Sequence, residues 1–327
     1  MTVSVSVCVP VYNRVADLPV AVASALRQPI DGLEVVVVDN ASTDGTWEAV
    51  AELAADDRRV RAFRNETNVG PAANWERAVA LARGTYVKYL GSDERLLDAA
   101  LPRLLDPLEH DREIGFAYGA MRWTVAGVRS PVYYEDAPAG RFDSEWFLRR
   151  AATMLDDVPA TPAAALLRRR DAAAFISRRV PSSLGLDFDP WMITTGPLVL
   201  WRCCARYPRL AHVAEPCVQV VDPIGEPAGR TRLLEEVDKL WWSYRDVFAH
   251  FLATADLPPR TRRTLTAILF LATVPLRPRG FRRQWARFGS LFPERYRWQR
   301  LPPPERELAR LAIRRLLTVP RVDEVEW

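Results

Sequence analysis

The sequence predicts an α/β fold, in which a mostly parallel sheet carries helices on both faces and a helical region follows at the C-terminus. Short β-branched runs alternate with amphipathic segments over the first 120 residues, an order typical of a parallel sheet. Residues 33–38 are apolar apart from Glu34, and four consecutive valines end the run, as expected of a strand covered on both faces. Beyond residue 229, longer arginine-studded segments divided by prolines replace this alternation.

Local signals place the elements of the first 120 residues. Asp17 precedes an amphipathic segment and opens a helix. Pro71 suits the first turn of a helix that Gly84 ends, and Asp44 is expected to cap the helix that it precedes. The predicted strands are 3–9, 33–38, 60–64, 85–90 and 114–118. The predicted helices are the one opened by Asp17 and those over 43–55, 71–83 and 96–109.

The remaining chain divides into two parts. Residues 121–223 show a mixed pattern, and we expect them to complete one unit with residues 1–120. Residues 224–327 form a separate, arginine-rich helical region. The elements expected in the mixed part are helices over 143–152 and 198–207, a short apolar segment over 163–167, and closing strands near 213 and over 217–221. The helices expected in the last region are 231–255, 260–274, 281–291 and 304–317.

The composition excludes several classes of protein. With 49% hydrophobic and 26% charged residues, the chain is neither wholly disordered, nor collagen-like, nor a multi-span membrane protein. The four cysteines include the adjacent pair Cys203 and Cys204 but no C-x-x-C motif, and there are only three histidines, which argues against a zinc site or a histidine triad.

Other features bear on location and origin. Residues 1–7 alternate without a basic segment, unlike a signal peptide. The apolar run over 265–276 is shorter than the roughly 20 residues of a membrane span. We therefore expect a cytoplasmic protein. Lys88 and Lys239 are the only lysines among 45 basic residues, a bias typical of a GC-rich bacterial genome.

Three polar segments follow predicted strands directly. Because the carboxyl ends of parallel strands meet at one edge of a sheet, the three segments should border one crevice. This arrangement brings Asp39, Asp93 and Glu94 together and adds Tyr12 as a flat aromatic surface. The segments are residues 10–14, 39–46 and 91–94.

This constellation resembles the family 2 glycosyltransferases, which have the GT-A fold. Four motifs carry the resemblance, in the family's order and at the family's spacing, and they cover residues 3–120 firmly and the chain to about residue 223 more faintly. The motifs are VCVPVYN at 7–13, VVVDNASTDGT at 36–46, NVGPAAN at 68–74 with ARGTY at 82–86, and YLGSDE at 89–94.

The resemblance implies a role for each residue of the crevice. Asp39 would accept hydrogen bonds from the base or ribose of a nucleotide-sugar, and Pro10 and Tyr12 would pack beside the base. Asp93 and Glu94 would supply oxygen ligands to Mg²⁺ or Mn²⁺ bridging the diphosphate. The other expected donor-binding residues are Asn13, Asn68, Asn74 and Ser92, although Asn74 is equally suited to bonding the backbone.

The sequence departs from the family pattern in two places. The metal motif has only two adjacent carboxylates, and the second is Glu94, whose side chain is longer than that of aspartate. In the alternative arrangement Glu94 points away from the metal and Asp93 is the main ligand. Inverting members carry a carboxylate general base just before a helix in the acceptor half. Here that position falls at residues 195–197, which include no carboxylate.

Three explanations for the absent base stay open. Asp187 or Asp189, displaced along the preceding loop, is the base; each is also suited to capping the following turn. Alternatively, the acceptor is an amine or already acidic and needs no strong base. In the third explanation catalysis has been lost.

The resemblance implies a metal-dependent, inverting transfer of a sugar from a nucleoside-diphosphate-sugar to an acceptor that the sequence does not identify. Residues 1–120 would bind the nucleotide-sugar and residues 121–223 the acceptor. A non-catalytic nucleotide-sugar binding or scaffold protein is the alternative. A sugar nucleotidyltransferase is a weaker one, because residues 10–14 lack the Gly- and Arg-rich phosphate loop of that class.

Residues 230–327 hold 20 Arg and Lys against 11 Asp and Glu, whereas the rest of the chain is net acidic. A divalent cation, and not this distant excess, would therefore neutralise the donor diphosphate. The simplest interpretation of the basic region is helices that pack on the core. A peripheral membrane contact and a homodimer interface are the alternatives, and the lack of a recognised module argues against nucleic acid.

Overall fold

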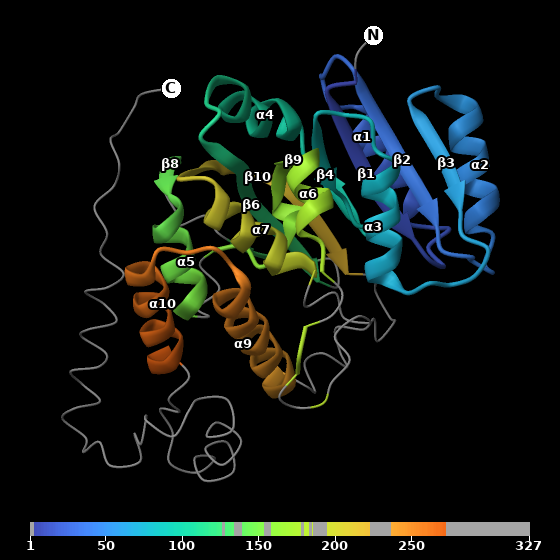
Figure 1. Cartoon of the computed structure of the whole chain (residues 1–327). Helices are drawn as coiled ribbons and strands as arrows, with labels where there is room; N and C mark the ends of the chain where they lie inside the picture. Colours follow the sequence, from blue (N-terminus) through green and yellow to red (C-terminus); the bar gives the residue numbers. More distant parts are fainter. Residues whose placement is uncertain are drawn as a thin grey trace.

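A computed structural model of the chain describes residues 3–125, 128–133, 139–153, 158–177, 180–182, 185, 195–222 and 237–272 (Figure 1). The described residues form one ten-stranded sheet in the order β3-β2-β1-β4-β9-β6-β10-β5, with β7 on β6 and β8 on β10. The strands are β1 Val5–Val11, β2 Leu33–Asp39, β3 Val60–Arg64, β4 Tyr86–Tyr89, β5 Glu94–Leu96, β6 Ile114–Val125, β7 Val128–Tyr133, β8 Gly140–Asp143, β9 Ala165–Arg168 and β10 Arg209–Asp222.

Helices cover the sheet on both sides, which confirms the predicted fold class. They are α1 Leu18–Leu26, α2 Thr46–Asp56, α3 Pro71–Leu81, α4 Ala100–His110, α5 Ser144–Thr153, α6 Arg169–Phe175, α7 Thr195–Arg206, α9 Val237–Thr254 and α10 Pro259–Ala272, with a short 3₁₀ turn, η1, over Pro162–Ala164. Figure 1 views the sheet from the side of α3, α6 and α7.

The valines of β2 show how two cores form. Val36 and Val38 belong to a cluster that includes residues of α3, α5, α7, α9 and α10. Val35 and Val37 belong to a second cluster with residues of α1 and α4. Successive side chains of a strand point to opposite faces, so an uninterrupted apolar run fills both cores at once. This explains why the four consecutive valines, residues 35–38, show no polar alternation.

The first half of the sheet is parallel and the second half is mixed. Strand β1 lies between β2 and β4 and runs parallel to both, and β3 is parallel to β2. Strand β9 then enters antiparallel between β4 and β6. The loops that follow β1, β2 and β4 therefore leave the sheet at one edge, as predicted.

Three of the differences from prediction follow from backbone conformation or strand pairing. Helix α2 begins at Thr46 and not at residue 43, because Gly45 stands before it in the left-handed region at φ 90°. The helix predicted over 96–109 begins only at Ala100, as α4, because Leu96 is the last residue of strand β5, which pairs with β10. The two predicted closing strands are one strand, β10, whose pairing with β6 shifts register around Pro216.

The first helices of the basic region pack on the α5–α7 side of the molecule. Trp201 of α7 meets Phe248 and Phe251 of α9 at ring-centroid distances of 4.6 and 5.9 Å, and Leu265 and Leu269 of α10 belong to the same core cluster. No helix among the described residues is both long and apolar enough to span a membrane. The helices predicted over 281–291 and 304–317 lie outside the described residues.

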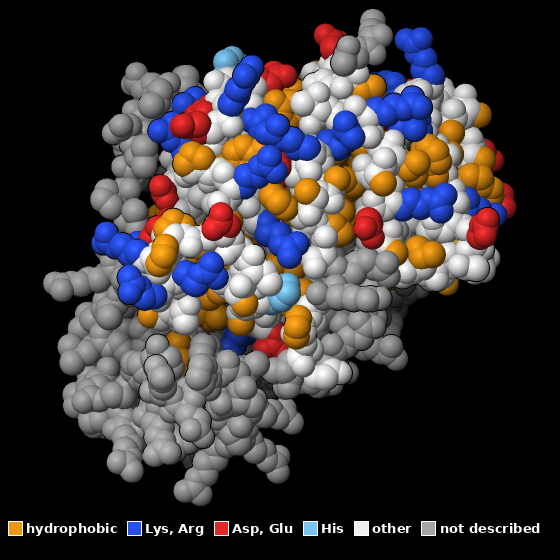
Figure 2. Space-filling view, in the orientation of Figure 1, with side chains coloured by type: hydrophobic (Ala, Val, Ile, Leu, Met, Phe, Trp, Pro, Cys, Tyr) orange, Lys and Arg blue, Asp and Glu red, His pale blue; other side chains and the backbone are white. Residues whose placement is uncertain are grey.

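Arginine is also prominent outside the basic region. Figure 2 shows Lys and Arg side chains spread across the face viewed in Figure 1, among fewer Asp and Glu. Exposed arginines near this face include Arg83, Arg169, Arg170 and Arg206. Asp171, which pairs with Arg206 at 3.0 Å, is itself buried. On the face shown, basic side chains therefore outnumber acidic ones, and Asp171 does not add to its surface charge because it is buried.

Gly84 allows the connection between α3 and β4 to pass close to the backbone of β1. A Cβ at Gly84 would lie 2.7 Å from the backbone nitrogen of Ser6 and 2.9 Å from the carbonyl carbon of Val5. We predict that Gly84→Ala lowers the free energy of unfolding by about 2 kcal/mol, because a central strand cannot give way. Urea unfolding followed by circular dichroism measures this. The neighbouring exposed Thr85→Ala should change it by less than about 0.5 kcal/mol, and equal stability of the two variants would refute the close approach.

Candidate functional site

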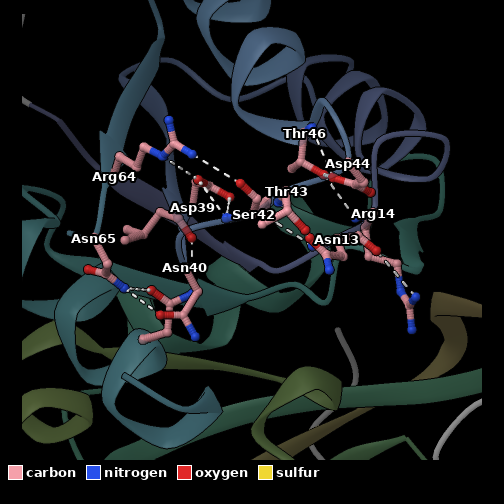
Figure 3. A network of polar contacts seen from close by, with 12 residues as sticks. Asn13, Arg14, Asp39, Asn40, Ser42, Thr43, Asp44, Thr46, Arg64 and Asn65 are labelled. Carbon is pink, nitrogen blue, oxygen red and sulfur yellow. Dashed lines mark hydrogen bonds and ion pairs between the residues drawn. The ribbon is translucent and has the colours of Figure 1, made fainter. Parts of the chain in front are cut away.

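Three strands end in register at the edge where the polar loops emerge. Val11 of β1 is the Cα partner of Asp39 in β2, and Asp39 is in turn the partner of Arg64 in β3. Figure 3 shows the side chains that these strand ends and their loops bring together. The site is therefore built on the ends of a rigid parallel sheet.

Asp39 is the buried acceptor of the site. Its side chain is 0% exposed and its two oxygens share the backbone N–H of Ser42 at 3.3 and 3.2 Å. Oδ2 also pairs with Nε of Arg64 at 3.1 Å. Arg64 is absent from the residues predicted to form the site. The register of β2 and β3 is the signal that identifies it, because both strands end at these two residues.

Asn13 joins the loop after β1 to the loop after β2. Its backbone N–H donates to Oγ of Ser42 at 2.9 Å, and its Oδ1 accepts from the N–H of Thr43 at 2.9 Å. Its φ of 49° lies in the left-handed region, which asparagine tolerates better than most residues. Asn13 is therefore held by protein contacts at both polar ends. Tyr12 beside it is 45% exposed, and Pro10 is half-buried in β1.

Asp44 supports the start of α2, as its expected capping role requires. Its carboxylate accepts from the N–H of Thr46 at 3.0 Å and from the N–H of Val15 at 3.3 Å. The hydroxyl of Thr46 in turn accepts from the N–H of Arg14 at 2.9 Å. These contacts hold the pKa of Asp44 below its usual value. Asp44 thus fixes the two loops and does not extend the crevice.

A cluster of amides braces the neighbouring segment. Asn65 donates to the side-chain oxygens of Asn40 and Asn74 at 2.8 and 2.9 Å. Asn74, predicted to bind the donor, also donates to the carbonyl of Val38 at 3.0 Å, so it follows the alternative of bonding the backbone. The oxygen of Asn68 accepts from Asn40 at 2.8 Å and from a backbone N–H at 2.9 Å. Asn68 and Asn74, both predicted to bind the nucleotide-sugar donor, therefore form hydrogen bonds within the protein that brace this loop.

Asp93 and Glu94 lie around Gly91 after β4. Oε2 of Glu94 accepts from the N–H of Gly91 at 2.7 Å. A Cβ on Gly91 would come within 2.7 Å of Oδ1 of Asp93 and 3.1 Å of Cδ of Glu94. The two carboxylates therefore crowd the same small space, which only a glycine leaves open. Ser92, between Gly91 and Asp93, is half-buried.

Lys88 places a buried positive charge close to this pair. Its ammonium donates to the carbonyl of Tyr89 at 2.9 Å and to the carbonyl of Ala163 in η1. Burial lowers the pKa of Lys88 to about 8, against the opposing effect of Glu94. Burial and the neighbouring Asp93 raise the pKa of Glu94 to about 7. A second positive charge near Glu94, in addition to Lys88, would lower the pKa of Glu94, because opposite charge favours the ionised carboxyl.

Other predicted site residues fall elsewhere. Asp187 and Asp189 lie outside the described residues. The first turn of α7, at the family position of the base, carries no acidic residue, as the sequence indicates. The described residues contain no group of three or more His, Cys, Asp or Glu side chains placed to hold a metal ion.

The raised pKa of Glu94 predicts a pH dependence of stability. Between pH 4.5 and 7 the folded chain holds a proton at Glu94 that the unfolded chain has lost, so this group's contribution to stability falls as the pH rises through that window. In EDTA, we predict that Glu94→Gln removes this part of the pH slope, measured by urea unfolding at pH 5, 6 and 7. Glu109→Gln, at an exposed residue, is the control. The same slope in Glu94→Gln and the wild type would contradict the assignment.

The model of one protein family, Glycosyl transferase family 2, matches residues 6–174. An uncharacterized glycosyltransferase of Haemophilus influenzae is 32% identical over 102 residues, which are 31% of this chain and 41% of that protein. The GalNAc(5)-diNAcBac-PP-undecaprenol beta-1,3-glucosyltransferase of Campylobacter jejuni is 37% identical over 101 residues, or 31% of this chain and 33% of that protein. The matched segment thus spans less than half of these relatives.

Residues 1–349 of S. aureus TarS, solved in complex with UDP-GlcNAc, superpose with a TM-score of 0.63 over 88% of this chain and 80% of that one, at 17% identity. This likeness shows the GT-A fold that the sequence motifs imply. The family model spans strands β1 to β4 and the loops that carry Tyr12, Asp39 and Asp93. The chain belongs to glycosyl transferase family 2.

Proposed function

We propose that the protein is a glycosyltransferase that moves a sugar from a nucleoside-diphosphate-sugar to an acceptor of unidentified class, with inversion at the anomeric carbon. The observation that carries the proposal is the meeting of an exposed aromatic ring, a buried carboxylate and a crowded carboxylate pair at one edge of the sheet. Membership of the family supports the same activity. It also favours glycosyl transfer over the nucleotidyltransferase alternative.

The two ends of a nucleotide-sugar match the two ends of this edge. Tyr12 offers an exposed ring beside Asp39, a carboxylate that accepts N–H or O–H donors from a base or ribose. The carboxylates of Asp93 and Glu94 follow β4, on the other side of β1 from β2. Because β1 lies between the two loops, a nucleotide lying across its end would reach both.

The residues after β4 fit a divalent cation. Mg²⁺ in proteins is commonly held by one or two carboxylates, with substrate phosphates and water completing the shell, so a two-carboxylate motif suffices without a third protein ligand. Asp93 and Glu94 would hold Mg²⁺ or Mn²⁺, because their two side chains meet in the small space beside Gly91. When bound, the cation would neutralise charge on the departing nucleoside diphosphate.

We predict that Asp93→Ala removes the dependence of nucleotide binding on the cation. Wild type should bind UDP, dTDP or GDP at least about tenfold more tightly with Mn²⁺ than with EDTA, because the cation reduces the electrostatic repulsion between the diphosphate and the carboxylates of Asp93 and Glu94. Isothermal titration calorimetry measures both conditions. Asp98→Ala, at an exposed carboxylate four residues beyond Glu94, should behave as wild type. Mn²⁺-dependent binding that persists in Asp93→Ala would exclude the metal assignment.

The proton of the acceptor needs a destination. The first turn of α7 offers threonine, glycine and proline, none of which is a base at neutral pH. We retain Asp187 and Asp189, in the preceding segment, as candidates for the general base. An acceptor that needs no strong base is the alternative.

We predict that Asp187→Asn or Asp189→Asn lowers turnover by about 100-fold, the usual contribution of a general base, and leaves the Kd for the nucleotide unchanged. Release of UDP, dTDP or GDP from the matching sugar nucleotides provides the assay, with water as the acceptor. Full turnover in both variants would remove both residues as bases. Tight binding without turnover in the wild type would favour the non-catalytic scaffold.

The remaining proposals concern the chain as a whole. We propose a division into a catalytic unit over 1–223 and a helical region over 224–327, in a cytoplasmic protein. A peripheral membrane contact and a homodimer interface remain the two proposed roles of residues 230–327 beyond packing. Of these residues, the structure describes only 237–272.

A further inference from the structure

Two side-chain pairs join the ends of β2 and β3. Asp39 pairs with Arg64, and the next residues, Asn40 and Asn65, are joined by the hydrogen bond between their amides (Figure 3). The backbone continues the match, since the N–H of Asn65 donates to the carbonyl of Asp39 at 2.8 Å. The amide pair is linked to α3, because Asn65 also donates to the side-chain oxygen of Asn74. The Asp39–Arg64 pair instead faces the loop that carries Ser42.

The guanidinium of Arg64 is fixed from three directions although it is 41% exposed. Nε pairs with Oδ2 of Asp39 at 3.1 Å, and Nη2 donates to the carbonyl of Ser42 at 3.0 Å. The guanidinium carbon also lies 5.5 Å from the ring centroid of Trp47 in α2, within the range of a cation–π contact. These three contacts hold the guanidinium between the end of β2, the loop of Ser42 and the first turn of α2.

These contacts set the direction in which Asp39 can accept. An ionised carboxylate has about four acceptor sites. Arg64 and Ser42 both donate to Oδ2, whereas among the described contacts Oδ1 accepts only from the N–H of Ser42, at 3.3 Å. Oδ1 therefore keeps acceptor capacity on the side away from Arg64, which a ligand reaches only when a neighbouring group moves, because the Asp39 side chain is 0% exposed.

Arg64 also reaches the aromatic side of the site through one shared residue. Ser42 accepts from Arg64 with its carbonyl and from the N–H of Asn13 with its hydroxyl. Asn13 directly follows Tyr12. A single guanidinium thus fixes both the carboxylate and the loop of the exposed ring.

We propose that Arg64 is a positioning residue for nucleotide binding, which holds Asp39 with Oδ1 turned to accept from the donor base or ribose and fixes the loop of Tyr12. The inference rests on the proposed function, because it assigns Arg64 to the nucleotide part of that site. Arg64 itself need not touch the ligand. Its effect passes through Asp39, and this dependence separates positioning from a general contribution to stability.

A double-mutant cycle tests the dependence. Isothermal titration calorimetry with Mn²⁺ measures the Kd of whichever of UDP, dTDP and GDP binds the wild type most tightly. We expect Arg64→Met to weaken binding about tenfold in the wild-type background and less than about twofold in the Asp39→Asn background, because interacting residues are not additive. Arg64→Lys keeps the charge without the planar fork and should weaken binding about threefold.

Arg59 provides a matched control. It is 40% exposed, directly precedes β3, and pairs with Asp57 at 2.7 Å, but it lies at the opposite end of the strand from Arg64. Arg59→Met should leave the Kd within about twofold, since exposed ion pairs away from the ligand contribute little. If Arg64→Met does not fold, Arg64→Lys carries the same cycle.

The outcomes distinguish failure of the positioning role of Arg64 from failure of the proposed function. Wild-type affinity in Arg64→Met, or the same fold loss with and without Asp39→Asn, would overturn the positioning role while leaving the proposed function intact. If the wild type binds none of the three nucleotides, the proposed function fails and this inference fails with it.

Discussion

The parallel placement of β1 between β2 and β4 is the constraint on which the rest of the site depends. It requires strands that are apolar on both faces, and the valines of β2 divide alternately between the two cores. It also requires that the chain leave the sheet at one edge after each strand. The polar residues after β1, β2 and β4 meet because the apolar residues before them pair in register.

The first half of the fold was largely predictable from sequence, because each element has a strong local signal. The strand Val60–Arg64 has the predicted bounds, and Pro71 begins α3 as expected. Prediction fails where pairing decides. Leu96 is the predicted first residue of a helix but ends β5, because β5 pairs antiparallel with β10, more than 120 residues further along the chain.

The site divides in the same way. Asp39, Asp93 and Glu94 could be selected because carboxylates at strand ends carry a motif. Arg64 and Lys88 could not, because a lone arginine or lysine in a strand carries no motif. The place of Arg64 beside Asp39 follows from the register of β3 on β2, and the place of Lys88 near Glu94 follows from its burial. Asn74 shows the reverse case, since a residue within a motif is engaged by Asn65 and the carbonyl of Val38.

We propose that the loops after β1, β2 and β4 form one site for a nucleoside diphosphate and its cation. Paramagnetic broadening of backbone amide signals by Mn²⁺ in the presence of UDP, dTDP or GDP tests it directly. With nucleotide and Mn²⁺ together, we expect loss of the signals of Gly91, Ser92 and Ser42, while that of Tyr207, between α7 and β10, persists. Broadening that spares the first three residues, or that is centred on another part of the chain, would contradict it.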